Sequence, residues 1–456
     1  MLIFGGKMMI NEMYGTMKNI PQFLIAAPTS GSGKTTVSRG LMALLAKKGR
    51  IVQPFKCGPD YIDTKYHTAV CGRSSINLDT FMASAEHVRQ LYARYSADAD
   101  VAVAEGMMGM FDGYARDRGS SAEIAQLLDI PVVLVVDAKS AAYSVAPLLS
   151  GFIHFRPGVR VVGVIFNRVG SPRHYGMLQE VCANLGITCF GYLPKQKTLE
   201  QESRHLGLDF NRSGVTDSLD LLIDLLEQHV DWESLLRHAT RPLPAGLPEV
   251  SARHPGTLHI TVARSEEAFS FLYAEHLDIL HSLGTVTFFN PEDDRPIPAD
   301  TDLLYLPGGY PEHRSAELAG ALHTRESVRE YIERGGKALA ECGGMIYLSQ
   351  AILHDATAAQ PARADSMAGV FPFSISNEQE CRKLTLGYRQ FTYNGQHLRG
   401  HEFHYTQFAG SDVMSSVAQV CNALGHPVAT PVFRYKNAIA SYTHLYWGEI
   451  DLMSLF

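Results

Sequence analysis

The 456-residue sequence lacks the features of several protein classes. It has no basic excess: 40 Lys and Arg stand against 47 Asp and Glu, a net charge of −7, which argues against a duplex nucleic-acid partner. Its seven cysteines are odd in number and form no C-x-x-C pair, which argues against a disulfide framework or a zinc site. The longest uncharged stretch, 141–155, is interrupted by Pro147 and Gly151 and is too short to span a membrane. We therefore expect a cytoplasmic protein without a membrane or nucleic-acid partner.

The N-terminal half alternates short apolar runs with amphipathic stretches. Such alternation predicts a parallel, doubly wound α/β sheet, whose ligand loops lie at the carboxyl ends of the strands. The helices predicted between the runs include Thr35–Lys48 and Ser121–Leu128. The predicted buried strands are Phe23–Ala27, Ile51–Phe55, Val101–Ala104, Val132–Val136 and Val161–Phe166.

A proline-rich stretch divides the chain into two α/β domains. Residues 237–256 hold four prolines with little periodicity and are predicted to be a linker between domains at 21–236 and 257–456. Residues 1–20 are predicted to be an N-terminal extension. The pattern then restarts with predicted elements at Leu258–Ala263 (strand), Ala268–Leu283 (helix), Val286–Phe289 (strand) and Leu303–Leu306 (strand).

The first predicted strand leads into a glycine-rich loop and a helix. Glycines let the backbone N–H groups of such a loop face a phosphate, while a lysine reaches the terminal phosphates and a hydroxyl binds Mg²⁺. Pro28 stands where a Walker A loop has its first glycine, but the Gly-Lys-Thr order between strand and helix is kept. We therefore predict an ATP site made of Ser30, Gly31, Ser32, Gly33, Lys34, Thr35 and Thr36.

Three acids follow strands at the same predicted sheet edge. Asp60 and Asp63 follow the second strand, and Glu105 ends the third apolar run. Mg²⁺ takes one or two carboxylates together with phosphate and water, so these acids are candidates for substrate activation, with Asp60, Glu105 and Thr35 as candidate metal ligands. A helix cap or a solvated surface position would explain any one of the acids taken alone. Asn167 follows another strand and is a candidate for contacting the nucleotide, although a turn would explain it equally well.

A cysteine in the second domain has the setting of a nucleophile. Cys342 lies between a predicted strand, Ala338–Ala340, and a helix, where the helix N-terminus favours a thiolate. Gly343, with Gly308 and Gly309 after another strand, could supply backbone N–H groups to an oxyanion. A cysteine nucleophile also needs a base, and the candidates in this domain include His401, His404 and His444.

Nine motifs, in order, resemble the cobyrinic acid a,c-diamide synthase family, and the resemblance spans residues 23–447. In the first half they are Ser-Gly-Ser-Gly-Lys-Thr-Thr (30–36), Gly-Pro-Asp-Tyr-Ile-Asp (58–63), Glu-Gly-Met-Met-Gly-Met-Phe-Asp-Gly (105–113) and Ser-Arg-His-Leu-Gly-Leu (203–208). In the second half they are Gly-Gly-Tyr-Pro-Glu (308–312), Glu-Cys-Gly-Gly (341–344), Leu-Gly-Tyr-Arg (386–389), Arg-Gly-His-Glu-Phe-His-Tyr (399–405) and Ala-Ser-Tyr-x-His (440–444).

The resemblance implies a dethiobiotin-synthetase-like ATP domain followed by a class I-like glutaminase domain. It implies that His444 is the base for Cys342, and that ammonia from glutamine amidates the a and c carboxylates of a corrin-type macrocycle activated by MgATP. The protein is also a candidate homodimer. Triad glutaminases carry a Glu two residues after the histidine, where this sequence has Tyr446, so the orienting group of His444 stays open.

Two kinds of alternative remain at this point. Relatives amidate hydrogenobyrinic acid or nickel sirohydrochlorin, and the motifs do not separate these substrates from cobyrinic acid. Cobyric acid synthase is disfavoured because its relatives carry a different sequence where this chain has the stretch that begins at Glu105 (105–113). A P-loop partitioning or regulatory ATPase would account for the first domain alone and would leave Cys342 without a purpose.

Overall fold

The computed structural model describes residues 18–196, 213–243, 256–356, 361–410 and 414–456. The chain forms two compact units, whose boundary after residue 249 falls in the undescribed segment 244–255. The 203–208 motif and most of the predicted N-terminal extension also lie outside the described residues. Each unit is considered by itself.

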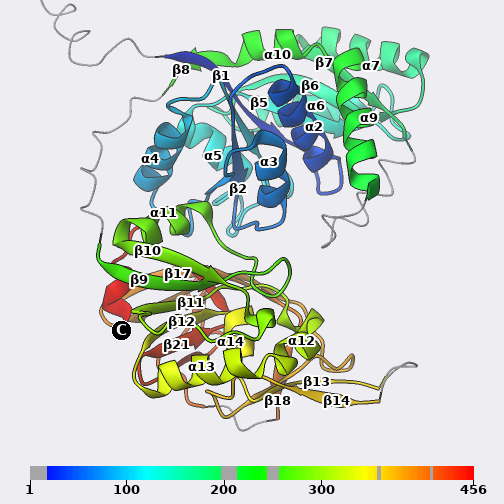
Figure 1. Cartoon of the computed structure of the whole chain (residues 1–456). Helices are drawn as coiled ribbons and strands as arrows, with labels where there is room; N and C mark the ends of the chain where they lie inside the picture. Colours follow the sequence, from blue (N-terminus) through cyan, green and yellow to red (C-terminus); the bar gives the residue numbers. More distant parts are fainter. Residues whose placement is uncertain (1–17, 197–212, 244–255, 357–360, 411–413) are drawn as a thin grey trace, which may run out of the picture. The chain divides into compact units, whose positions relative to one another are not determined.

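The first unit is built on one predominantly parallel sheet (Figure 1). Its strand order is β3-β2-β4-β1-β5-β6-β7, and the short β8 pairs antiparallel with β1. The bounds are β1 (Asn19–Ala26), β2 (Val52–Cys57), β3 (Ile76–Leu78), β4 (Val101–Glu105), β5 (Val132–Asp137), β6 (Val161–Val169), β7 (Thr188–Pro194) and β8 (Thr240–Pro242). This order puts β1 between β4 and β5, so the loop after β1 lies beside the end of β4.

Helices cover the sheet because its strands are apolar on both faces. Phe23 and Ile25 of β1 pack with α2, α9 and α10 in one buried cluster, while Phe55 of β2 contacts Tyr92 of α4 with ring centroids 4.8 Å apart. A Cβ on Gly40 of α2 would lie 2.4 Å from a side-chain atom of Leu226 in α9, so glycine permits the close packing of these helices. The bounds are α2 (Lys34–Lys47), α3 (Asp63–Cys71), α4 (Ala85–Ser96), α5 (Ser121–Leu128), α6 (Val145–His154), α7 (Pro172–Leu185), α9 (Ser213–His229) and α10 (Trp232–Ala239).

The predicted α/β class is confirmed, and the five strands predicted in this half all occur with small shifts at their ends. The start of the predicted linker is wrong. Residues 237–239 complete α10, and residues 240–242 form β8, where Pro242 pairs with Asn19 of β1. A proline can end an edge strand, because an edge leaves its missing N–H without a required partner. Residues 237–242 therefore belong to the first unit and not to a linker.

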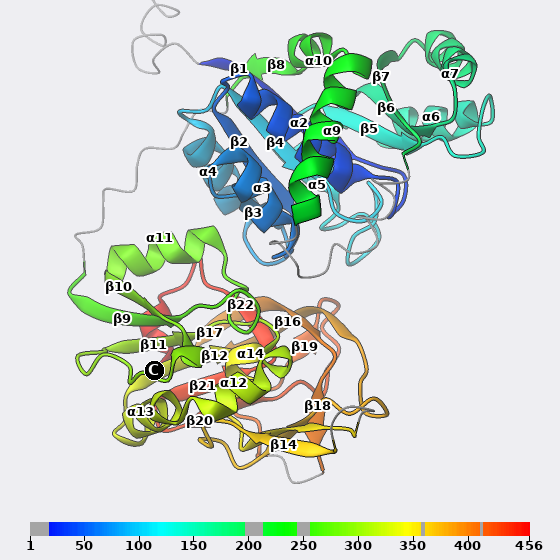
Figure 2. The same ribbon diagram turned by 45° about the vertical axis from the view of Figure 1, so that its right-hand side comes forward.

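The second unit contains a six-stranded sheet of order β10-β9-β11-β12-β21-β20, parallel except for β20 (Figure 2). Side chains alternate between its faces. Leu304 and Leu306 face a cluster with α13 and α14, whereas Leu303 and Tyr305 face a cluster with α11. The strands are β9 (Leu258–Ala263), β10 (Gly284–Phe289), β11 (Leu303–Leu306), β12 (Lys337–Glu341), β20 (Val432–Tyr435) and β21 (Ala438–Ser441), and the helices are α11 (Ala274–Leu283), α12 (Ser315–Gly320), α13 (Leu322–Glu333) and α14 (Gly343–Tyr347).

Two smaller sheets extend this unit. One has the order β14-β13-β15-β18 and the other β19-β16-β17-β22. Short 3₁₀ turns complete the unit at Pro291–Asp293 (η1), Pro311–His313 (η2) and Leu452–Leu455 (η3). The bounds are β13 (Ala351–His354), β14 (Arg363–Ser366), β15 (Ser374–Ser376), β16 (Thr385–Tyr393), β17 (Gln396–His404), β18 (Gln407–Ala409), β19 (Cys421–Asn422) and β22 (Thr443–Tyr446).

One predicted helix of this unit begins later than expected. The helix predicted from Ala268 starts at Ala274, because the preceding residues form a loop tied to the glycine-rich turn after β11. The backbone N–H groups of Ser270 and Phe271 both donate to the carbonyl of Gly308, at 2.9 and 3.0 Å. This tertiary contact competes with helix formation, and sequence periodicity does not reveal it.

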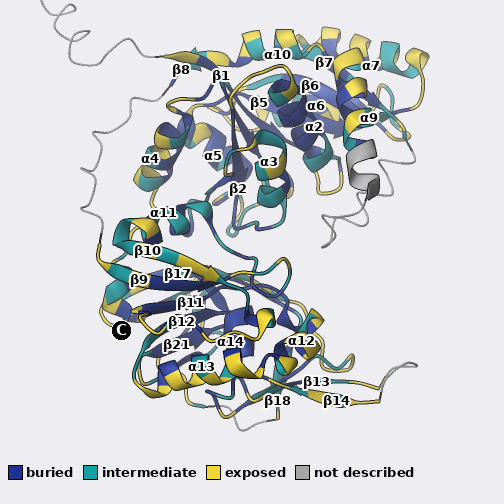
Figure 3. Ribbon diagram, in the orientation of Figure 1, coloured by how far each residue is buried: buried dark blue, intermediate teal, exposed yellow. Residues whose placement is uncertain are grey.

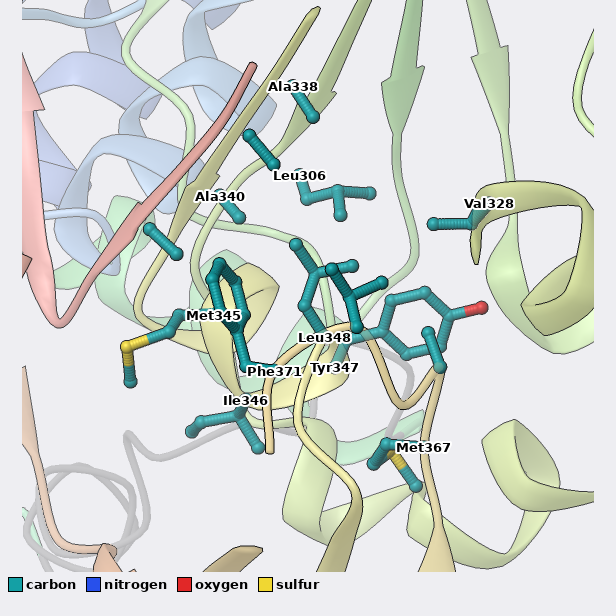
Figure 4. Close-up of a cluster of buried hydrophobic side chains, with 14 of the residues drawn as sticks. Leu306, Val328, Ala338, Ala340, Met345, Ile346, Tyr347, Leu348, Met367 and Phe371 are labelled. Atoms are coloured by element: carbon teal, nitrogen blue, oxygen red, sulfur yellow. The ribbon is translucent and has the colours of Figure 1, made fainter. Parts of the chain in front are cut away.

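The support for the turn at Cys342 is a densely apolar core (Figure 4). Met345, Ile346 and Tyr347 of α14 are almost completely buried, and they pack in the same cluster as Leu306 and Ala340 at the ends of β11 and β12. Figure 3 shows this part of the unit mainly in the colour of buried residues. The short helix that follows Cys342 is therefore held rigidly against the sheet.

Candidate active sites

The first site is the loop between β1 and α2. Gly31 and Gly33 adopt φ values of +76° and +98°, which glycine accepts readily. Asn167 at the end of β6 donates to the backbone oxygen of Ser32 at 2.9 Å, and a Cβ on Gly33 would lie 2.1 Å from its amide nitrogen. The structure thus brings Asn167 against the glycine-rich loop, beside the first turn of α2.

Hydroxyl and carboxylate groups gather next to this loop. Thr35 donates to Glu105 at 2.7 Å and lies 3.5 Å from Asp63. Asp60 is arranged differently, since its Oδ1 accepts the backbone N–H groups of Ile62 and Asp63 at 2.8 Å each and caps the start of α3. Two of the three predicted acids therefore lie beside Thr35, while one carboxylate oxygen of Asp60 is occupied by hydrogen bonds from the backbone.

A buried lysine, Lys56, joins these acids. The register of β2 and β4 pairs Lys56 with Glu105, so their side chains meet at the carboxyl ends of two neighbouring strands. Its ammonium contacts Asp63 and lies 2.9 Å from Glu105, whose other oxygen is 2.8 Å from His67. Sequence reasoning missed Lys56 and His67, although the position of Lys56 at a strand end beside the acids was a usable signal.

Burial and charge shape the ionisation of this cluster. Burial disfavours the charged form of Lys56, but Glu105 and Asp63 outweigh it and raise the lysine pKa well above its usual value. For Glu105 the burial effect is likewise outweighed by Lys56 and His67, and the pKa is well below normal. Burial raises the pKa of Asp63 to about 7. Burial, with the nearby charge of Lys56, lowers the pKa of Lys34.

The second site is the turn at Cys342. Cys342 has φ +45°, a left-handed conformation that is uncommon outside glycine and typical of a strained nucleophile turn. Its N–H donates to the carbonyl of Ser441 in β21 at 2.7 Å, and its thiol lies 3.7 Å from the carbonyl of Phe403 in β17. Cys342 is 2% exposed, so a reactant reaches it only through a confined site.

The two glycine turns meet at this cysteine. A Cβ on Gly343 would lie 2.9 Å from the backbone nitrogen of Gly309, and a Cβ on Gly308 would lie 2.1 Å from Cε1 of His444. Burial raises the Cys342 pKa well above its usual value, and hydrogen bonds from the N–H groups of Gly343 and Gly309 to the sulfur act in the opposite direction. These N–H groups lie beside the sulfur, so they are close to any oxyanion that would form on a carbon bonded to it.

His444 is the predicted histidine that contacts the glycine turn. It lies on β22 opposite His401 of β17 and is fully buried. Burial, together with His401 and His404, lowers its pKa to about 3, so the ring is neutral near pH 7. His404 is engaged elsewhere: its Nε2 lies 2.8 Å from Glu402 and its Nδ1 lies 2.7 Å from the carbonyl of Thr406.

Glu341, the buried acid before Cys342, anchors the strand that carries His444. Glu341 accepts the N–H of Leu445 at 3.2 Å and the hydroxyl of Tyr305 at 2.8 Å. Tyr446, at the position of the missing triad acid, donates its hydroxyl to Glu275 of α11. Sequence reasoning missed the anchoring role of Glu341, because the contact depends on how β12 and β22 are brought together.

Two kinds of feature are absent from the described residues. No group of three or more His, Cys, Asp or Glu side chains there is arranged to hold a metal ion on its own. Within the same residues, no helix combines the length and apolar character needed to cross a bilayer.

Comparison with known proteins covers both units. Residues 23–208 match the family described as CobQ/CobB/MinD/ParA nucleotide binding domain, and residues 259–451 match the CobB/CobQ-like glutamine amidotransferase domain. Hydrogenobyrinate a,c-diamide synthase of Brucella ovis is 39% identical, over 93% of this chain and 98% of its own length. Cobyrinate a,c-diamide synthase of Caldanaerobacter subterraneus is 38% identical, over 93% of this chain and 94% of its own. The match extends through the second unit, which the partitioning-ATPase alternative does not explain, and the chain therefore belongs to the cobyrinate and hydrogenobyrinate a,c-diamide synthase family.

Proposed function

We propose that this protein amidates the a and c carboxylates of cobyrinate, using ATP and ammonia released from glutamine. The observation that supports it most strongly is that Cys342 and His444 each lie against the Gly308–Gly309 turn, in a chain whose relatives include a cobyrinate a,c-diamide synthase aligned over nearly its full length. Because ATP and glutamine are cytoplasmic metabolites, we place the reaction in the cytoplasm.

The glutaminase half follows from the geometry around the thiol. The Cys342 sulfur attacks the glutamine carboxamide after His444 takes its proton, and the same histidine returns a proton to the departing ammonia. The N–H groups of Gly309 and Gly343 stabilise the oxyanion that forms. The resulting thioester is then hydrolysed by water to glutamate.

The synthetase half belongs to the glycine-rich loop. A substrate carboxylate attacks the γ-phosphate of ATP, and ammonia displaces phosphate from the acyl phosphate. Lys34 neutralises charge on the phosphates, and Asn167 holds the loop. The Thr35 hydroxyl and the carboxylates of Asp63 and Glu105 are the hard oxygen donors that Mg²⁺ prefers, and they fit this ion better than Asp60 with its capping role. When bound, Mg²⁺ would offset negative charge on the phosphates.

The test uses purified protein with MgATP, glutamine and either cobyrinate or hydrogenobyrinate, followed by mass spectrometry. Each amidation lowers the product mass by about one unit, because NH₂ replaces OH. Cys342→Ala is expected to lose glutamine-dependent product and to keep ammonia-dependent product. Product from hydrogenobyrinate but not from cobyrinate would identify hydrogenobyrinate as the substrate. If neither gives product, nickel sirohydrochlorin is the next substrate to test. Consumption of neither ATP nor glutamine with any tetrapyrrole would refute the amidation itself.

A further inference from the structure

Glu312, in the turn η2 that follows the Gly308–Gly309 pair, is a buried acid without an assigned purpose. It is only 7% exposed, and its Oε2 atom has no hydrogen-bond partner among the residues that the structure describes. A buried carboxylate oxygen left unpartnered is costly, and native proteins keep such groups where a ligand completes them.

Glu312 lies next to the nucleophile. The residue before it, Pro311, has its Cδ 3.0 Å from the position of a Cβ on Gly343, the residue after Cys342. Burial raises the pKa of Glu312 to about 7, and the negative charge of its ionised form acts on both Cys342 and Tyr442. The turn that supplies the Gly309 N–H thus also supplies an acid to the same site.

The charges around this site leave Glu312 open to a cation. Glu402, the other acid that acts on Cys342, is neutralised by Arg389 and lies 2.8 Å from His404. Arg382 is the basic residue whose charge acts on Glu312, and it is exposed, with its guanidinium 5.7 Å from the ring centre of Tyr405. A small zwitterion would find an acid for its ammonium here, with a basic residue in the same neighbourhood.

We propose that Glu312 binds the α-ammonium group of the glutamine substrate and so selects glutamine over simple amides. This assignment rests on the proposed glutaminase reaction and names the group that recognises its substrate. An ammonium donates up to three hydrogen bonds, and one of them would satisfy the open oxygen of Glu312. The carboxamide at the other end of the same molecule is then directed toward Cys342.

The arrangement also couples substrate binding to nucleophile activation. The charge of Glu312 opposes ionisation of Cys342, and an ammonium bound to Glu312 would cancel this repulsion. The thiolate would then form most readily when glutamine is in place. An unoccupied site would hold a protonated, poorly reactive thiol, which protects it from adventitious alkylation and oxidation.

The experiment compares wild type, Glu312→Gln and Glu312→Asp, with the exposed Glu317→Gln as matched control. Glutamine is tested against glutaramate, which is glutamine without its α-amino group. Glu312→Gln is expected to lower kcat/KM for glutamine about 100-fold, mainly through KM, as loss of a charged hydrogen bond predicts. It should also remove most of the preference over glutaramate, and Glu312→Asp should restore at least part of it.

A second readout separates recognition from structural damage. Without glutamine, the pH dependence of Cys342 alkylation by iodoacetamide should shift to lower pH in Glu312→Gln than in wild type, whereas a loosened turn that merely exposes the thiol would raise the rate at every pH. Ammonia-dependent amidation should be unchanged. An undiminished preference for glutamine in Glu312→Gln, or equal losses in the Gln and Asp variants, would overturn the assignment. Failure of the proposed function looks different, because wild type itself would then not hydrolyse glutamine.

Discussion

Replacing Gly308 by alanine is expected to abolish the glutaminase reaction while sparing the synthetase reaction. The new Cβ would lie 2.1 Å from Cε1 and 2.7 Å from Nδ1 of His444. Carbon atoms in contact prefer separations of about 3.5–4.0 Å, so the ring or the turn must move by about 1.5 Å. His444 is fully buried, and the turn is tied through the Gly308 carbonyl to Ser270 and Phe271, so neither can yield freely.

A displacement of this size has a defined kinetic consequence. Misplacing a catalytic group by about 1 Å costs about 100-fold in rate, so kcat/KM for glutamine should fall by at least that factor. Gly320→Ala is the matched control, because a Cβ at Gly320 would have no heavy atom within 4 Å. Glutamate release measures the glutaminase, and amidation with ammonium chloride measures the synthetase. A Gly308→Ala enzyme with glutaminase within threefold of wild type would refute the placement of His444 beside this turn.

The remaining predictions concern the two buried clusters. Lys56→Met should leave the carboxylates of Glu105 and Asp63 without their shared lysine, destabilise the first unit by about 3–5 kcal/mol and abolish amidation even with ammonia; an unchanged calorimetric unfolding temperature would contradict this. Glu341→Ala should remove the acceptor of the N–H that follows His444 and cost about 1–3 kcal/mol, measured by denaturant unfolding against Glu341→Gln, which keeps an acceptor oxygen. Acid should also destabilise the second unit. His401 and His444 have folded pKa values of about 4 and about 3, so between pH 6.5 and these values the unfolded chain binds more protons, and stability falls as pH falls. At pH 5 each histidine is expected to lower the free energy of unfolding by about 2 kcal/mol. An unfolding temperature that stays constant from pH 7 to pH 5 would argue against both lowered pKa values.

Much of the first unit could be predicted from local sequence patterns. Apolar runs at regular intervals predict parallel strands, and the Gly-Lys-Thr order between strand and helix predicts a phosphate loop. Both signals are local, because they depend on side-chain period and on the backbone freedom of a few glycines. Asp63, Glu105 and Thr35 could be expected together, since strand ends of a parallel sheet share one edge.

Other features depended on contacts between distant segments. The late start of α11 follows from hydrogen bonds to Gly308, and the strands of the β14-β13-β15-β18 sheet are only three or four residues long. Strands this short carry little local pattern, so their pairing partners determine them. The same holds for β8, which extends the first sheet with residues that resemble a linker.

The sequence by itself determined the chemistry available: a phosphate loop, acids at strand ends, and a cysteine followed by glycines. It also determined the family, because nine motifs appear in order along the chain. Only the tertiary structure decided which of three histidines contacts the Gly308 turn, and that Lys56 is buried among the acids. Only it showed that Glu312 has an open oxygen beside Cys342. These relations join residues tens to hundreds of positions apart, and they exist only once packing has fixed which strands are neighbours and which side chains are removed from water.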